Sequence, residues 1–177
     1  MDDWFVALVE EHGADIHAYL SRRTMGGVAD DLLGDVWVAA YAGRSSYDPE
    51  LGTARAWLFG VARHVLHGYY RKQRPRVRRF LGIDRGTDET AAVDDRLDAA
   101  ALGPALRAGL RELPAVEREL LLLVAWENLT PTEAAQVLGI PAGTARSRLH
   151  RARSRMDERL GGSAQIQDEE TRQEADR

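Results

Sequence analysis

The chain has 177 residues, no cysteine and a formal net charge of -4 at pH 7. This length allows one ordinary domain or two small ones, and the absence of cysteine excludes disulfides and thiolate metal sites. The negative charge argues against a protein that coats nucleic acid without selectivity, because such proteins are usually basic overall. No apolar run approaches the length of a membrane span or a signal peptide, so we expect a cytoplasmic protein without membrane insertion.

Two core-facing helices are predicted at the start of the chain. Apolar residues recur at helical spacing from Trp4 to about Arg23, and Gly26-Gly27 separates this helix from a second one at about Ala29 to Ala42. The polar side of the second helix carries three carboxylates, Asp30, Asp31 and Asp35. Two interpretations are open for them: solvated groups that favour the helix N-terminus, or an acidic strip that docks on a basic partner.

The third predicted helix, from Ala54 to about Arg74, changes character along its length. A turn cluster at 45–49 and a break with a cap at Gly52-Thr53 precede it, and its first half is apolar at helical spacing. Its end interleaves aromatic and basic residues, namely Tyr69, Tyr70, Arg71, Lys72 and Arg74. Such residues bind single-stranded nucleic acid by base stacking and phosphate contacts, although Tyr69 fits a core equally well. His64 and His67 lack a third ligand, so we expect neither metal nor cofactor.

Residues 76–98 are predicted to be a linker. This segment begins basic, turns acidic and polar, and lacks the apolar residues that a core requires. We therefore expect an all-α fold with two small helical domains, at 1–75 and 99–160, on either side of it. Basic residues cluster on both sides of the linker, as expected for a protein that contacts one polyanion at two points.

Four helices are predicted in the second domain. Gly103-Pro104 opens the first, and Pro114 ends it and begins another that runs to about Glu127. Residues 129–160 then encode two helices joined by a tight turn. Thr130-x-x-Glu133 is a capping box for the shorter helix, which Gly139 ends in the left-handed conformation.

The last helix of this domain, from about Ala142 to Leu160, has two distinct faces. Its apolar stripe consists of Ala145, Leu149, Ala152, Met156 and Leu160. The opposite face presents Ser147, His150, Arg151 and Ser154 between two pairs of flanking arginines, Arg146 with Arg153 and Arg148 with Arg155. Guanidinium groups suit phosphates and the shorter side chains suit base edges, so this face is typical of a helix that reads a major groove. A solvated, charged face is the other interpretation.

Gly161-Gly162 is predicted to end this helix. The remainder, 161–177, is acidic and polar, so we expect a disordered tail.

The helical domain, linker and helix-turn-helix together resemble a bacterial RNA polymerase sigma factor of the compact extracytoplasmic-function (ECF) type. Four blocks carry the resemblance: ADDLLGDVWVAAY at 29–41, ARAWLFGVARHVLHGYYRKQR at 54–74, LRELPAVERELLLL at 110–123, and LTPTEAAQVLGIPAGTARSRLHRARSRMDERL at 129–160. Relatives often carry Asn where His64 stands and a polar or acidic residue where Gly68 stands. These two positions lie in the segment that reads the -10 promoter element in the family.

The resemblance implies a protein that binds core RNA polymerase and promoter DNA, usually under the control of an anti-sigma factor, and that is a monomer when free. Its polymerase-binding residues would be Asp30, Asp31 and Asp35. Residues for the -10 element would be Tyr47, Arg55, His64, Tyr70, Arg71, Lys72 and Arg74. Residues for the -35 element would be Thr144, Arg146, Ser147, Arg148, His150, Arg151, Ser154 and Arg155.

Three other classes of protein are alternatives to a sigma factor. A conventional helix-turn-helix regulator would be a stable dimer on a palindromic operator, and only 129–160 would touch DNA. A decoy that binds polymerase without reading DNA would not need the arginine-rich helix. An enzyme is disfavoured, because the sequence shows no phosphate-binding glycine loop, no nucleophile with a base and no metal constellation.

Overall fold

The computed structural model describes residues 3–81 and 103–175, with side chains described as far as Gln73 in the first range and Gly161 in the second. Within these ranges the chain forms seven α-helices, one short 3-10 helix and no strand, which confirms the predicted all-α class. Residues 82–98 of the predicted linker lie outside the described residues.

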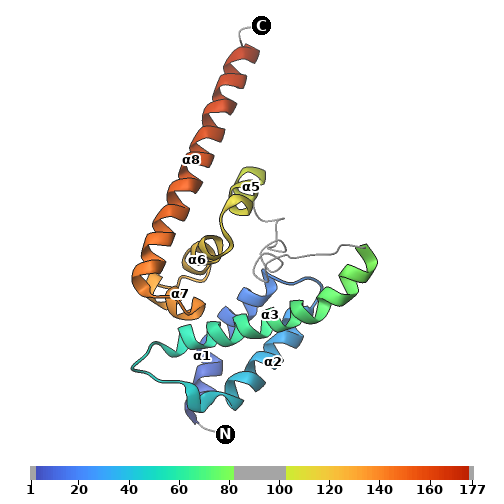
Figure 1. Cartoon of the computed structure of the whole chain (residues 1–177), viewed down its shortest axis with the longest axis vertical. Coiled ribbons are helices and arrows are strands. Elements are labelled where there is room, and N and C mark those ends of the chain that lie inside the picture. The colour runs from blue at the N-terminus through green and yellow to red at the C-terminus, as the bar shows by residue number, and fades with distance from the viewer. Residues whose placement is uncertain (1–2, 82–102, 176–177) are drawn as a thin grey trace.

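The N-terminal unit consists of α1 (Asp3–Ser21), α2 (Val28–Ala42), the short η1 (Arg44–Ser46) and α3 (Ala54–Leu81). The predicted apolar stripes fill its centre, where Ile16, Val36 and Leu58 are fully buried, one from each helix. Figure 1 shows α3 crossing the molecule with α1 and α2 on one side. The loop before α3 therefore lies at one end of this three-helix unit, and the basic end of α3 lies at the other.

The C-terminal unit consists of α5 (Pro104–Glu112), α6 (Ala115–Ala125), α7 (Pro131–Leu138) and α8 (Ala142–Ala175). The predicted signals at α7 are confirmed: Thr130 and Glu133 form a reciprocal capping box, and Gly139 ends the helix at φ 63°. Ala134 and Ala135 are both buried, so no bulky side chain separates α7 from its neighbours. Helix α8 begins at Ala142 as predicted and is the long helix that extends away from the rest of the chain in Figure 1.

Two predicted helix ends are wrong. Helix α3 continues past Pro75 to Leu81, where the sequence predicted an end near Arg74 and a linker from residue 76. A proline inside a helix costs about 3 kcal/mol through one lost hydrogen bond and a steric clash. The sequence after Pro75 includes Arg76, Arg78 and Arg79. Cations are favourable near a helix C-terminus, so these residues offset part of the cost of the proline.

Helix α8 likewise passes through Gly161-Gly162 and ends at Ala175, so most of the predicted disordered tail is helical. Glycine in a helix interior costs about 1 kcal/mol relative to alanine, which weakens a helix without ending it. Ala, Gln, Glu and Arg dominate the sequence beyond Ser163, and these residues are strong helix formers.

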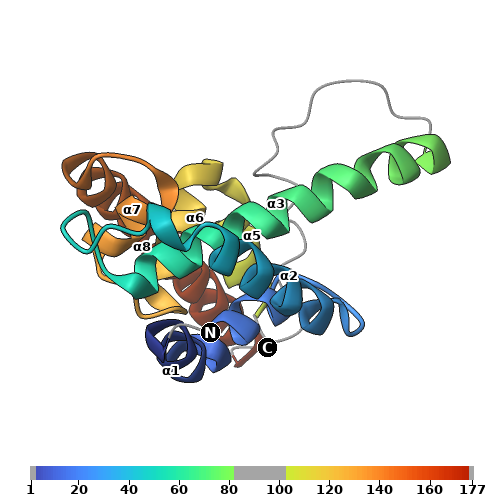
Figure 2. The same cartoon turned by 90° about the horizontal axis from the view of Figure 1, so that it is seen from below.

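The two units share one hydrophobic core. A single cluster of buried residues includes Phe59 and Leu66 of α3 together with Leu120 and Leu123 of α6 and Ala134 of α7. Figures 1 and 2 both show α3 between the α1–α2 pair and the α6–α7 pair. The described residues thus form a closed arrangement, in which the two predicted domains pack against each other through α3.

We expect Gly139→Ala and Gly34→Ala to change stability in opposite directions. An added Cβ meets no atom within 4 Å at either position, but Gly139 has φ +63° and Gly34 lies inside α2. Alanine in the left-handed conformation costs about 1 to 2 kcal/mol, whereas alanine in a helix interior gains about 0.5 to 1 kcal/mol over glycine. Urea unfolding followed by circular dichroism checks both values. Equal shifts for the two variants would contradict the assignment of Gly139 as the end of α7.

Candidate nucleic-acid interface

The two faces of α8 are separated as the sequence predicted. Ala145, Leu149, Ala152 and Met156 are buried, and Leu160 packs against the second apolar cluster. The opposite side exposes Arg146, Ser147, His150, Arg151, Arg153 and Arg155, with Thr144, Arg148 and Ser154 half-buried at its edges. The predicted -35 residues are therefore brought together on one accessible surface of a helix-turn-helix.

Glu117 of α6 holds two arginines of this surface. Its carboxylate accepts from Arg151 Nε at 3.3 Å and from Arg155 Nη1, and the Glu117 side chain is itself buried. No local sequence signal indicated these pairs, because Glu117 lies 34 and 38 residues away from its two partners in the chain. A buried carboxylate that accepts from two guanidinium groups restricts their rotamers, so it orients two of the candidate DNA contacts.

Tyr47 lies inside an aromatic stack in the loop before α3. Its ring is stacked on Trp4 with centroids 5.4 Å apart and an interplanar angle of 15°, and it lies 5.6 Å from Trp57. Trp4 was predicted to face the core but is 43% exposed. The structure thus adds Trp4 to the neighbourhood of a predicted -10 residue.

Along α3, the predicted -10 residues divide into two groups. His64, Arg71 and Lys72 are exposed, and the side chain of Arg74 lies outside the described residues. Tyr70 is 5% exposed and donates its hydroxyl hydrogen to the carbonyl oxygen of Arg23. The structure therefore corrects the base-stacking interpretation of Tyr70: in the closed arrangement its ring belongs to the core.

Arg55, the remaining predicted -10 residue, faces the C-terminal unit. Its Nη2 donates to the Glu127 carbonyl at 2.6 Å, and its Nη1 donates to the Asn128 carbonyl at 3.3 Å. The same guanidinium group donates to Asp15 at 3.0 Å. Arg63 lies about two turns further along α3. It donates to both carboxylate oxygens of Glu119 of α6, from Nε at 2.7 Å and from Nη2 at 3.2 Å.

A buried ion pair joins the end of α1 to the end of α6. Arg23 Nη1 donates to Glu127 Oε1 at 2.9 Å, and Arg22 Nη2 donates to the other oxygen of the same carboxylate. The side chains of Arg23 and Glu127 are only 2% and 1% exposed. The guanidinium of Arg23 also lies 3.9 Å from the centroid of the Tyr19 ring. No sequence signal predicted this contact, because its partners are 104 residues apart.

The three predicted polymerase-binding carboxylates, Asp30, Asp31 and Asp35, are all exposed on α2. Asp30 accepts from His17 Nε2 at 3.0 Å. Val38, one turn beyond Asp35 on the same side of the helix, is 72% exposed. The strip is therefore acidic with an apolar end.

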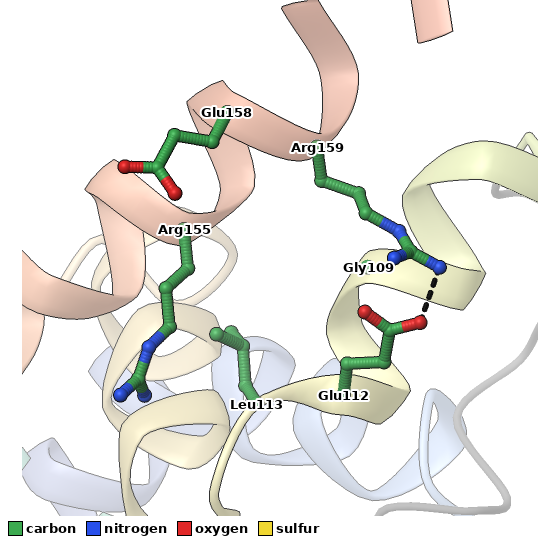
Figure 3. Close-up of a pocket in the computed structure, with 6 residues that line it drawn as sticks. All are labelled: Gly109, Glu112, Leu113, Arg155, Glu158 and Arg159. Carbon is green, nitrogen blue, oxygen red and sulfur yellow. Dashed lines mark ion pairs between the residues drawn. The ribbon is translucent and has the colours of Figure 1, made fainter. Parts of the chain in front are cut away.

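The groove between α5 and α8 has a volume of about 360 Å³ and mixed charge. Figure 3 shows Arg159 paired with Glu112 across it, with Glu158 and Arg155 on the same wall of α8. Alternating charges of this kind neutralise one another and do not select an anion or a cation.

Among residues 3–73 and 103–161, no three His, Asp or Glu side chains gather as metal ligands. No helix in the part of the chain that the structure describes is long and apolar enough to cross a membrane.

Known families match both units of the chain. Residues 8–76 match Sigma-70 region 2, and residues 104–156 match Sigma-70 region 4. The ECF RNA polymerase sigma factor EcfG of Rhodopseudomonas palustris is 33% identical over 128 residues, which is 72% of this chain and 68% of that protein. The chain belongs to the ECF sigma factors. SigF of Caulobacter vibrioides, another member, is 32% identical over 150 residues, or 84% of this chain and 80% of the relative.

The arrangement of the helices has solved counterparts. The sigma factor RpoE of Bartonella quintana, solved with the anti-sigma factor NepR, superposes with a TM-score of 0.61 at 24% identity, covering 91% of this chain and 98% of that one. CnrH, solved with the cytosolic domain of CnrY, gives a TM-score of 0.58 at 26% identity, with coverages of 89% and 88%. This sigma factor accordingly serves promoter recognition and transcription initiation, with core RNA polymerase and promoter DNA as its partners, and a conventional dimeric regulator is not favoured.

Glu133 of this sigma factor joins the capping box to the loop before α3. Burial by itself would raise its pKa, but hydrogen bonds from the Thr130 backbone and from the Thr53 and Thr130 hydroxyls, with the charge of Arg55, lower the pKa below its ordinary value. The Thr53 hydroxyl lies 2.8 Å from Glu133 Oε1. The ionised carboxylate of Glu133 therefore stabilises both the capping box and the contact with Thr53.

We expect acid to destabilise the wild-type chain more than the Glu133→Gln variant. A carboxyl with a lowered folded-state pKa contributes stability that is complete above the unfolded-state value, about 4.5, and is lost as pH falls through the lower folded-state value. Urea midpoints between pH 7 and pH 3 measure the difference. Thr53→Val removes one of the donors, so its pH dependence should lie between those of the wild type and Glu133→Gln. Parallel curves for all three proteins would rule out this role of Glu133.

Proposed function

We propose that the N-terminal unit of this sigma factor reads the -10 element and the C-terminal unit reads the -35 element. The observation that supports this most strongly is the exposed face of α8, where cationic and short polar side chains stand opposite a buried apolar stripe. The major groove of duplex DNA is wide enough to admit an α-helix with its side chains. The match of residues 104–156 to Sigma-70 region 4 supports the same assignment.

On the -35 element, we infer that Ser147, His150 and Arg151 approach base edges while the flanking arginines contact phosphates. Ser147 donates its hydroxyl hydrogen to the Thr144 carbonyl at 3.0 Å, so its oxygen remains able to accept from a base. Glu117 of α6 pairs with Arg151 and Arg155 and so fixes the orientation of both guanidinium groups. Thr144, Arg146, Arg148, Ser154 and Arg155 complete the proposed set.

On the -10 element, the proposed contacts are Tyr47, His64, Arg71, Lys72 and Arg74, with Arg55 available once the two units separate. Tyr47 lies in the loop before α3, stacked on Trp4 and in tilted contact with Trp57, and this aromatic surface could extend to an unpaired base. The exposed His64 provides a hydrogen-bond donor and acceptor on the same helix. Trp4 joins this set as a residue that positions Tyr47.

Core RNA polymerase is proposed to dock on α2 through Asp31, Asp35 and Val38, with Asp30 at the edge. Two carboxylates and an exposed valine on one helix face fit a surface with basic groups around an apolar spot. An anti-sigma factor is a further proposed partner, because RpoE of Bartonella quintana was solved with one. We infer that the chain acts in the cytoplasm, as a monomer when free, and as an initiation factor rather than an enzyme.

The polymerase-binding strip predicts the behaviour of an Asp31→Ala, Asp35→Ala double variant. It should bind purified core RNA polymerase more weakly than the wild type does and yield less transcript in run-off reactions on genomic fragments. Weakening by about tenfold corresponds to the loss of about 1.4 kcal/mol at the interface.

The matched control for this experiment is Glu10→Ala, Glu11→Ala, which removes two exposed carboxylates from α1 of the same unit. Its binding should equal that of the wild type. If both double variants weaken binding equally, general charge rather than the α2 strip controls docking.

The -35 assignment predicts that Arg151→Ala loses sequence discrimination. A side chain that contacts a base edge contributes about 1 to 3 kcal/mol at one base pair, so the variant holoenzyme should respond less than the wild type to substitutions in the -35 element. Binding is measured on a promoter recovered by run-off transcription and on its single-base variants.

Arg153→Ala serves as the comparison, because Arg153 is exposed on the flank of the same face. It should weaken binding to all sequences alike and reduce the salt dependence, as expected for a phosphate contact. A uniform loss with Arg151→Ala would place Arg151 on phosphate as well.

A further inference from the structure

The five arginines on the proposed reading face of α8 are not equivalent. Three of them have side chains that make no hydrogen bond or ion pair with another described residue: Arg146, Arg148 and Arg153. The other two, Arg151 and Arg155, lie one turn apart and share the carboxylate of Glu117 on α6. One face therefore combines cations that are available to any phosphate with cations that already have a partner.

The Glu117 carboxylate lies beneath these two arginines. Its side chain is 8% exposed, whereas those of Arg151 and Arg155 are 53% and 50% exposed. An unpaired carboxylate at such a buried position would be costly, so its pairs persist where a fully exposed salt bridge would yield to solvent. A DNA phosphate that approaches from the solvent side therefore meets guanidinium groups that Glu117 already holds.

The hydrogen bonds to Glu117 use different nitrogen atoms of the two arginines. Arg151 donates from Nε at 3.3 Å, so both of its Nη groups can still donate to another acceptor. A guanidinium fork of this kind matches the O6 and N7 acceptors of a guanine. Arg155 instead donates from Nη1, an end group of its fork. Glu117 thus leaves Arg151 able to make a bidentate contact with a base and occupies one end of Arg155.

The packing of α6 against α8 does not depend on these ion pairs. A separate apolar cluster joins α8 to the rest of the unit, and its buried members are Leu110, Leu113, Leu122, Ala152 and Met156. Both arginines are about half exposed, so water can solvate them when the carboxylate is absent. A neutral side chain at position 117 should therefore change the direction and net charge of the arginines and leave the helices in place.

We propose that Glu117 is a positioning residue that determines specificity at the -35 element without touching DNA. It holds Arg151 by Nε with the fork free for a base edge, and its charge cancels part of the attraction of both arginines for phosphates. Phosphate contacts bind all sequences alike, so this cancellation lowers the affinity for unrelated DNA and raises the share of binding that depends on sequence. The proposal rests on the proposed assignment of α8 to the -35 element.

Glu117→Gln tests the proposal, because it removes the charge and keeps the shape of the side chain. The full chain is combined with core RNA polymerase. Binding is titrated on a promoter fragment recovered by run-off transcription and on the same fragment with its -35 element replaced, each over a range of salt concentrations. Circular dichroism of the free variant checks that the helices are retained.

The Glu117→Gln holoenzyme should bind the replaced fragment more tightly than the wild type does. It should discriminate between the two fragments at least about fivefold less, which is the lower limit for one well-made base contact. Its plot of log affinity against log salt should be steeper by about 0.9, as expected for one additional phosphate contact. Glu117→Asp keeps the charge, so it should retain the wild-type salt dependence.

A double-mutant cycle with Arg151→Ala shows whether Glu117 acts through that arginine. In the Arg151→Ala background, Glu117→Gln should still change the salt dependence, through Arg155, and should leave the discrimination unaltered. A further loss of discrimination in that background would overturn the proposal. Weaker binding of Glu117→Gln to both fragments at an unchanged salt dependence would overturn it as well, since a purely structural role has that result.

The wild-type holoenzyme distinguishes a failure of the proposed function from a failure of this role of Glu117. If the wild type binds both fragments equally, the assignment of α8 to the -35 element is wrong, and the role of Glu117 is wrong with it. If the wild type discriminates and Glu117→Gln discriminates equally well, the assignment of α8 stands and Glu117 does not determine specificity.

Discussion

The buried pairing of Arg22 and Arg23 with Glu127 is the contact around which the described structure is organised. It joins the end of α1 to the end of α6 and brings the Tyr70 hydroxyl onto the Arg23 carbonyl. With these groups in place, α3 becomes the central helix of one shared core and not the edge of a separate domain. The accessibility of each proposed DNA contact follows from this arrangement.

The two proposed reading surfaces differ in how they are presented. The proposed reading face of α8 is exposed, and Glu117 pairs with two of its arginines, so this face is accessible in the structure as it stands. The surface of α3 is instead occupied by Glu119 and by backbone carbonyls near Glu127. A protein of net charge -4 that covers some of its own cations should bind DNA weakly when alone, and strongly only when polymerase fixes both units on one promoter.

Local signals in the sequence predicted local structure well. The capping box at Thr130, the left-handed Gly139 and the apolar stripe of α8 depend on residues within a few turns of one another, and all three are confirmed. The helix ends near Pro75 and Gly161 were wrong because a single breaking residue costs only a few kcal/mol, which neighbouring helix formers can offset. The interface between the units could not be predicted, because charged residues far apart in the sequence are expected on the solvated surface. Tyr70 was predicted to be accessible for the same reason, since the carbonyl group that it contacts belongs to a distant part of the chain.

The central claim is that the two units of this sigma factor read two separate promoter elements, the N-terminal unit the -10 element and α8 the -35 element. The most direct test is crosslinking from a photoreactive group on a cysteine introduced at Lys72 of α3 or at Ser147 of α8, both exposed in a chain that has no other cysteine. In the complex with core RNA polymerase and promoter DNA, we expect the group on α3 to crosslink near the -10 element and the group on α8 to crosslink near the -35 element. Crosslinks from both positions to the same element would contradict the account.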